Sequence, residues 1–164
     1  DFRKMERGKL HLNVCQMDLI PYLRQIHQDF TDQANLQNIQ FIFHTEAENL
    51  LCWFDGRQLR KVFTNLLSNA FKHTPEKGKI ELSITDKGDS IYIKVIDSGK
   101  GIPSKALPFI FDRFYQADSA RHAAGSGLGL AVSANLAHAM GMELTAHLSD
   151  AAPRSLSITL TCPR

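Results

Sequence analysis

The chain has 164 residues, of which 43% are hydrophobic, and a formal net charge of +2, which suits one domain with its own core. Its basic residues are interspersed with acidic ones and form no stripe for nucleic acid, and no apolar run is long enough to cross a bilayer. Three scattered cysteines indicate neither a disulfide framework nor a zinc site, so we expect reduced thiols and a cytoplasmic location.

The first half of the chain predicts two helices that begin at acidic caps. Asp18 is a candidate N-cap for a helix with apolar residues spaced by three and four, and Pro21 is tolerated in its first turn. Asp55 caps a longer helix, with Gln58 as capping-box partner, and Pro75 ends that helix. Short strands are expected at residues 11–14, 39–43 and 51–54.

The second half predicts strands arranged mostly in hairpins. Apolar residues alternate with polar ones over residues 79–85 and 91–96, which a turn containing Gly88 joins. A helix over residues 127–140 ends at Gly141, and two more alternating strands follow at 143–148 and 155–161. The expected fold is α+β, a two-layer sandwich whose mixed, mostly antiparallel sheet is covered by about three helices.

Two asparagines and a lysine share one stripe of the helix that follows Asp55. At about 100° per residue, Asn65, Asn69 and Lys72 lie roughly 110° from the centre of the apolar face. Amide oxygens suit Mg²⁺, which also shares phosphate oxygens, and a lysine can meet a phosphate. From this helix alone, a solvated face with incidental asparagines is an equally good interpretation.

An acidic residue precedes two glycines after the strand at 91–96. Asp97 could accept a hydrogen bond from an exocyclic amine, and Gly99 and Gly101 would let a flat ring approach the backbone. An ordinary Asp-Ser-Gly turn is the alternative interpretation.

Glycines also lead into the helix predicted over residues 127–140. Gly125, Gly127 and Gly129 would leave backbone N–H groups at a helix start, where a polyphosphate can bind. The spacing matches neither the Rossmann nor the Walker fingerprint, and a flexible glycine cap is the alternative.

Four segments in this order resemble the motifs of the catalytic, ATP-binding domain of bacterial sensor histidine kinases, in the superfamily shared with gyrase and MutL-type ATPases. Residues 65–74 resemble the N box of that Bergerat fold, 97–101 the G1 box, 111–114 the F box and 125–130 the G2 box. The resemblance extends from residue 10 to 164. Residues 1–9 resemble the end of a dimerisation helix or a linker.

The resemblance implies a role for each matching position. Asn69, helped by Asn65, would hold Mg²⁺, Lys72 would touch phosphate and Arg121 would meet the γ-phosphate. The implied catalytic residues are Asn65, Lys72 and Arg121. Asp97 would accept the adenine amine, and Phe111 and Phe114 would anchor a lid. The residues implied to bind or enclose the nucleotide are Asn69, His73, Asp97, Gly99, Gly101, Ile102, Phe111, Phe114, Gly125, Gly127, Leu128 and Gly129.

Three departures from the family pattern bear on function. The glycine box reads Gly-Ser-Gly where threonine is common, and Gly141-Met142 replaces a frequent glycine pair. None of the seven histidines lies in a His-Glu-Leu-Arg-Thr-Pro-like acceptor motif. The implied activity is therefore transfer of the γ-phosphoryl of Mg·ATP to a histidine on a separate dimerisation segment.

The implied partners are that phosphoacceptor segment and, downstream, a response regulator. The parent protein could be anchored in the inner membrane, but we expect no membrane contact by this domain and a monomeric isolated fragment. A catalytically silent nucleotide-sensing module is the alternative. A gyrase-type hydrolase is a weaker alternative. The resemblance would then imply a glutamate on this helix as the base that activates water, and Asn65 or Ser68 occupies that stretch here.

Overall fold

The computed structural model describes residues 11–99, 104–112, 128–149 and 155–164. A two-stranded sheet, a five-stranded sheet and a set of helices make up this part of the chain. In chain order the elements are β1 (Cys15–Asp18), α2 (Leu19–Asp29), α3 (Thr31–Gln37), β2 (Gln40–Thr45), β3 (Leu51–Phe54), α4 (Gly56–His73), β4 (Lys79–Asp86), β5 (Ser90–Asp97), the 3₁₀ helix η1 (Ser104–Phe109), α5 (Leu128–Ala139), β6 (Glu143–Ser149) and β7 (Ser155–Pro163).

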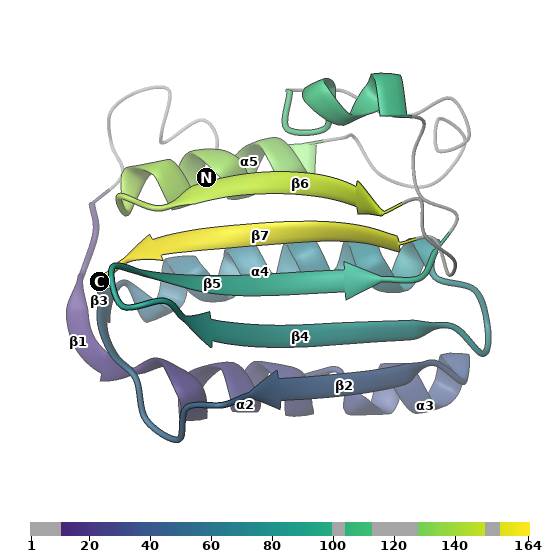
Figure 1. The fold of residues 1–164 in the computed structure, drawn as a ribbon, viewed down its shortest axis with the longest axis horizontal. Coiled ribbons are helices and arrows are strands. Elements are labelled where there is room, and N and C mark those ends of the chain that lie inside the picture. Colours follow the sequence, from purple (N-terminus) through teal and green to yellow (C-terminus); the bar gives the residue numbers. More distant parts are fainter. Residues whose placement is uncertain (1–10, 100–103, 113–127, 150–154) are drawn as a thin grey trace.

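The larger sheet has the strand order β2-β4-β5-β7-β6, and the α-helices lie against one face of it (Figure 1). Strands β2 and β4 run parallel, whereas the β4–β5, β5–β7 and β6–β7 pairs are antiparallel. The antiparallel pair β1–β3 forms a separate small sheet. The predicted α+β two-layer sandwich with a mixed, mostly antiparallel sheet is therefore confirmed.

The hydrophobic core lies between the larger sheet and the helices. Along β5, Ile91, Ile93 and Val95 are buried while the residues between them are more exposed, so one face of the strand packs inward. From α4 the predicted apolar stripe is buried, together with Leu67 and Phe71. Burying this stripe is what holds α4 along the sheet, because amphipathic packing rather than propensity stabilises most protein helices.

Both predicted acidic caps are present, and each also binds a second segment. Asp18 Oδ1 accepts from the backbone N–H groups of Ile20 and Leu50, which ties the start of α2 to the segment before β3. Asp55 caps α4 by accepting from the N–H groups of Arg57 and Gln58. The predicted reciprocal capping-box bond through the Gln58 side-chain oxygen is not formed, because that buried Oε1 has no hydrogen-bond partner among the described residues.

Two elements differ from the sequence-based expectation. The strand expected at residues 11–14 is β1, four residues later, because its register is set by pairing with β3, where Cys15 faces Phe54. Helix α3 was not predicted, since Ala34 is its buried residue and no apolar stripe marks it. The other predicted strands and helices are found within a few residues of their expected ends, and Gly141 follows the end of α5 with φ +75°.

Candidate functional site

The C-terminal half of α4 carries the first predicted group of site residues. Asn65 and Asn69, one turn apart, are both half-buried, and Lys72 and His73 are exposed in the last turn. Partial desolvation and then the charge of Lys72 lower the pKa of His73, which keeps its imidazole neutral at pH 7. The two amides thus lie at the border between core and solvent, where they can meet a hydrated ligand.

Asn65 also binds the neighbouring helix α5, which packs beside α4. Its Nδ2 donates to Ser133 Oγ at 3.2 Å. Sequence reasoning did not identify Ser133, although a lone serine in the apolar stretch after Gly129 was a signal that could have marked it. The contact joins the asparagine stripe to the helix that follows the glycine motif.

Asp97 ends β5 on the inward face of the strand, in line with Ile93 and Val95, and is 5% exposed. Its Oδ1 accepts from the backbone N–H of Gly99 at 3.0 Å. Burial raises the pKa of Asp97, and the hydrogen bond from Gly99 lowers it by a smaller amount. The resulting pKa is about 6. A buried carboxylate at a strand end, whose ionisation is costly, is typical of a ligand-binding position.

Residues 97–99, which we call the Asp97 turn, pack directly on the end of α4. A Cβ placed on Gly99 would overlap the carbonyl oxygen of His73, at a separation that real Cβ atoms do not show. Ser98 holds the turn from the other side, because its Oγ accepts from the Lys79 N–H at 2.8 Å. The structure therefore brings the predicted N and G1 segments together at one corner of the sandwich.

Thr74, directly after α4, adds an unpaired polar atom to this corner. It is 7% exposed, and its Oγ1 has no hydrogen-bond partner among the described residues. Its methyl group lies against Gly78, and a Cβ added to Gly78 would also approach Ser98 Oγ at 3.2 Å. An orphaned buried hydroxyl costs stability unless a water or ligand satisfies it, so this corner has unused hydrogen-bonding capacity.

The remaining predicted residues are only partly covered by the structure. Phe111 is partly buried against the core, and Leu128 and Gly129 are the first residues of α5. The described part therefore contains the predicted residues of α4 and of the turn after β5. The predicted residues that lie outside it are Gly101, Ile102, Phe114, Arg121, Gly125 and Gly127.

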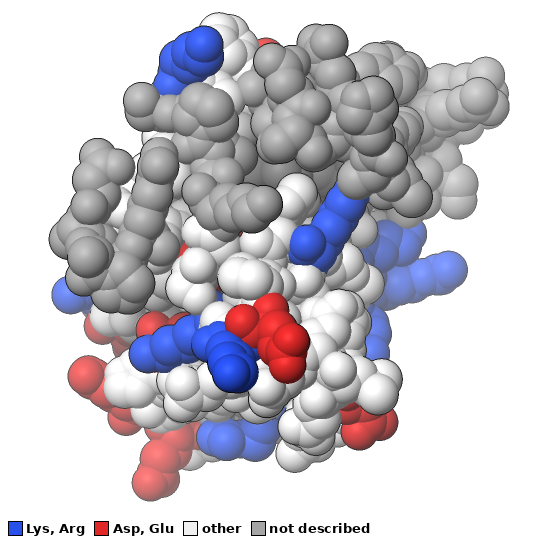
Figure 2. Space-filling model, turned by 90° about the vertical axis from the view of Figure 1, so that its right-hand side faces the viewer, with Lys and Arg blue, Asp and Glu red and all other residues white. Residues whose placement is uncertain are grey.

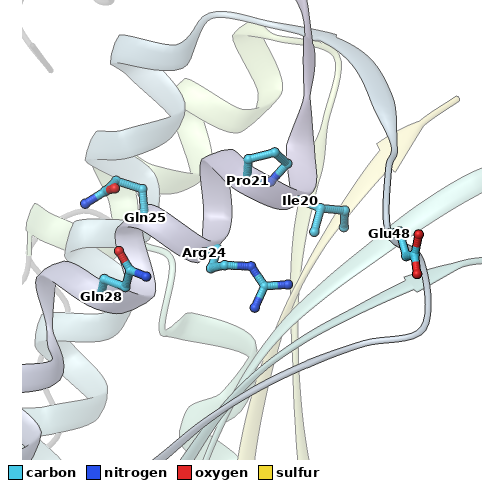
Figure 3. Close-up of a pocket in the computed structure, with 6 residues that line it drawn as sticks. All are labelled: Ile20, Pro21, Arg24, Gln25, Gln28 and Glu48. Carbon is cyan, nitrogen blue, oxygen red and sulfur yellow. The ribbon is translucent and has the colours of Figure 1, made fainter.

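A separate surface hollow of about 230 Å³ lies beside α2 and is lined by none of the predicted site residues (Figure 3). Arg24, Gln25 and Gln28 of α2 line it together with Glu48 from the loop between β2 and β3. The Arg24 guanidinium lies 4.8 Å from the centre of the Phe43 ring. Since Arg24 is thus engaged by an aromatic ring, we assign this hollow no binding role.

The surface near the contact between α4 and the Asp97 turn carries charges of both signs (Figure 2). Figure 2 shows lysine, arginine and acidic side chains of the described residues interspersed on the end of the molecule that faces right in Figure 1. Within the described residues no group of three or more His, Cys, Asp or Glu side chains could hold a metal. No described helix is both long and apolar enough to span a membrane.

Comparison with known proteins places these features in a family. A family model described as "Histidine kinase-, DNA gyrase B-, and HSP90-like ATPase" matches residues 54–164. The chain is 35% identical over 142 residues to Histidine kinase P4 of Formosa agariphila, covering 84% of this chain and 10% of that protein. It is 33% identical over 168 residues to the aerobic respiration control sensor protein ArcB of Escherichia coli, covering 99% and 22%.

Solved structures agree with this assignment. The nucleotide-free catalytic domain of histidine kinase ThkA superposes with a TM-score of 0.81 at 24% identity, covering 93% of this chain and 98% of that one, and shows the same fold. Full-length ShkA, solved in complex with AMPPNP, has a TM-score of 0.82 at 25% identity, covering 99% and 33%.

The chain spans 10% and 22% of the lengths of the two kinases compared above, so it corresponds to one part of such proteins. The matched part contains α4, the Asp97 turn and α5 in the order of the predicted N, G1 and G2 segments. The chain therefore belongs to the histidine kinase-, DNA gyrase B- and HSP90-like ATPase family and is the catalytic, ATP-binding domain of a sensor histidine kinase.

Proposed function

We propose that this domain binds Mg·ATP at the corner between α4, the Asp97 turn and α5, and donates the γ-phosphoryl group to a histidine on a separate dimerisation segment. The observation that carries the proposal is the contact of Gly99 with the His73 carbonyl. It places a buried carboxylate beside the end of the helix that bears two amides. Base recognition and phosphate recognition can then occur on one ligand.

The base end of the ligand would be read by Asp97. A buried carboxylate accepts a hydrogen bond from an exocyclic amine, and the pairing with Gly99 fixes the direction of Oδ1. Neutral His73 would pack beside the ring without adding charge. Glycine at position 99 lets this turn lie against the end of α4, because a side chain there would have no room beside the His73 carbonyl.

The phosphate end would meet Asn65, Asn69 and Lys72. Both amides are half-buried on one side of α4, and such oxygens fit Mg²⁺, which binds few protein ligands and keeps its waters and phosphate oxygens. When bound, Mg²⁺ would neutralise charge on the phosphates. Lys72 would hold the phosphate chain as a point charge, and Arg121, in the segment before α5, would meet the γ-phosphate.

Transfer would break the bond between the γ-phosphorus and its bridging oxygen, release ADP and form a phosphorus–nitrogen bond on the acceptor imidazole. The domain's residues contribute positioning and charge neutralisation rather than covalent chemistry. We further propose that residues 1–9 lead in from the dimerisation segment and that a response regulator receives the phosphoryl group. ThkA, a structural neighbour, has been solved in complex with a response regulator protein.

Calorimetric titration with a non-hydrolysable ATP analogue tests the binding half of this proposal. Wild type and Asn69→Ala are titrated with and without Mg²⁺. Thr64→Ala, on the exposed face of the same helix, is the matched control. We expect Mg²⁺-dependent binding that Asn69→Ala weakens and Thr64→Ala does not. Absence of binding in wild type would contradict the proposal.

The transfer half is tested in the parent kinase with labelled ATP. Acid-labile, base-stable phosphohistidine should form, and its rate should fall in Lys72→Ala and Arg121→Ala. Nucleotide binding with no phosphohistidine would instead identify a catalytically silent nucleotide-sensing module.

A further inference from the structure

Ser133 has a fully buried side chain, with 0% exposure, on helix α5. Ala131, Leu136 and Ala137 of the same helix are buried as well, so the surroundings of Ser133 on α5 are apolar. A hydroxyl in such a place lowers stability unless it is hydrogen-bonded. The amide of Asn65, 68 positions away in the chain and 3.2 Å away in space, provides that bond.

The hydrogen bond fixes the orientation of an amide with two different ends. Nδ2 of Asn65 is the donor and Ser133 Oγ the acceptor, so the nitrogen faces α5. The amide oxygen lies on the other branch of the same planar group and therefore points away from Ser133. The side chain at position 133 thus helps to set the direction of Asn65 Oδ1.

The contact also joins α4 to α5, the two helices at the proposed phosphate end of the site. Asn65 is one turn before Asn69 on α4, and Ser133 is one turn after Gly129 on α5. A change at Ser133 therefore acts on a group that faces the proposed cation, without itself being on the exposed surface.

We propose that Ser133 is a positioning residue for Asn65: its hydroxyl orients the amide so that the oxygen is presented to the divalent cation that accompanies the nucleotide phosphates. The inference rests on the proposed function of the site. It predicts a defect in cation dependence and not in base recognition, since Asp97 and Gly99 lie on a different element.

The test compares wild-type parent kinase with Ser133→Ala. Binding of a non-hydrolysable ATP analogue is measured by calorimetry over a series of Mg²⁺ concentrations and in EDTA, and phosphohistidine formation is measured in parallel. We expect the Mg²⁺ concentration for half-maximal binding to rise about three- to tenfold, because groups that orient metal ligands tune metal affinity. Binding in EDTA should be unchanged.

A double-mutant cycle separates orientation of Asn65 from a general packing defect. In an Asn65→Ala background, Ser133→Ala should change the Mg²⁺ dependence no further, since its effect passes through the missing amide. Ser133→Cys approximates the volume of the side chain with a weaker acceptor, and it provides the test should the alanine variant unfold. Ser83→Ala on β4 is the matched serine control.

Equal losses in the wild-type and Asn65→Ala backgrounds would overturn the inference, as would an equal loss of binding in EDTA. With a wild type that binds Mg·ATP and forms phosphohistidine, these outcomes contradict the role of Ser133 alone. A wild type without Mg²⁺-dependent binding would contradict the proposed function as well.

Discussion

Gly99 and His73 are in backbone contact across the corner of the sandwich, since a Cβ on Gly99 would overlap the His73 carbonyl oxygen. The same Cβ would lie 3.0 Å from Asp97 Oδ1. The end of β5 can therefore approach the end of α4 only with glycine at this position. The absence of a side chain at Gly99 therefore allows the two predicted binding segments to lie this close together.

Gly99→Ala is expected to separate these segments. The added Cβ meets backbone, which cannot rotate away, so we expect a loss of about 1–3 kcal/mol in unfolding free energy and weaker ATP binding. Urea unfolding and calorimetry measure the two effects. Gly56→Ala adds the same atom at the start of α4, where it would meet the flexible Met17 Cε at 3.1 Å, and should change little. Normal ATP affinity in Gly99→Ala would contradict the assignment of this corner.

Asp97→Asn should weaken ATP binding about ten- to a hundredfold, which corresponds to roughly 1.5–3 kcal/mol for a charge-assisted hydrogen bond. The same change should stabilise the nucleotide-free domain at pH 7, because the buried carboxylate, with its pKa raised from 3.8 to about 6, is costly to ionise. About two pKa units correspond to a gain of up to about 3 kcal/mol. Unchanged ATP affinity would remove Asp97 from the site.

The stability effect of Asp97 depends on pH with a defined sign. Since the folded state holds this proton to higher pH than the unfolded chain, the contribution of Asp97 is fully present below about pH 4 and is lost as pH rises through about 6. The difference in unfolding free energy between Asp97→Asn and wild type should therefore be small at pH 4 and large at pH 7. Denaturant titrations at several pH values check this, and a constant difference would contradict it.

ATP affinity should also follow the ionisation of Asp97. The carboxylate is the stronger acceptor, so the affinity ratio of wild type to Asp97→Asn should increase between pH 5 and 7 with a midpoint near 6. Taking the ratio cancels the titration of the nucleotide phosphates, which both proteins share. A ratio independent of pH would show that the carboxylate does not contact the bound nucleotide.

Asp55→Ala should destabilise the domain by about 1–2 kcal/mol, since it removes the cap of α4. Asp55 Oδ2 also accepts from the N–H of Asn13 at 2.8 Å, which anchors the entering chain. Asp55→Asn keeps one acceptor oxygen for the cap but not the second for Asn13, so an intermediate loss is expected in urea unfolding. Equal losses in both variants would mean that the Asn13 bond outweighs the cap.

Helix α4 could be predicted from the sequence because its signals are local. Asp55 supplies the cap, the apolar stripe supplies the buried face and Pro75 supplies the end. Helix α3 has no such stripe, and the position of β1 depends on its register with β3, which no local pattern encodes.

The candidate site also combines residues that local sequence patterns predict with contacts that depend on the folded structure. Asp97 and Gly99 were predictable because an acid beside glycines after a strand is a recognisable local pattern. The bond between Asn65 and Ser133 was not, since it depends on how α5 packs against α4. The orphaned hydroxyl of Thr74 is likewise visible only in the folded chain.

The order of elements has a consequence for synthesis on the ribosome. Residues 55–99 contain α4, β4 and β5 without interruption, and the β4–β5 hairpin returns the chain from Lys79 to Ser98. Short loops close at low entropic cost, so this stretch can come together early, whereas α5 and β7 must join it from much later in the chain. We therefore expect the nascent domain to bring Asp97 against the end of α4 before α5 and β7 have been translated.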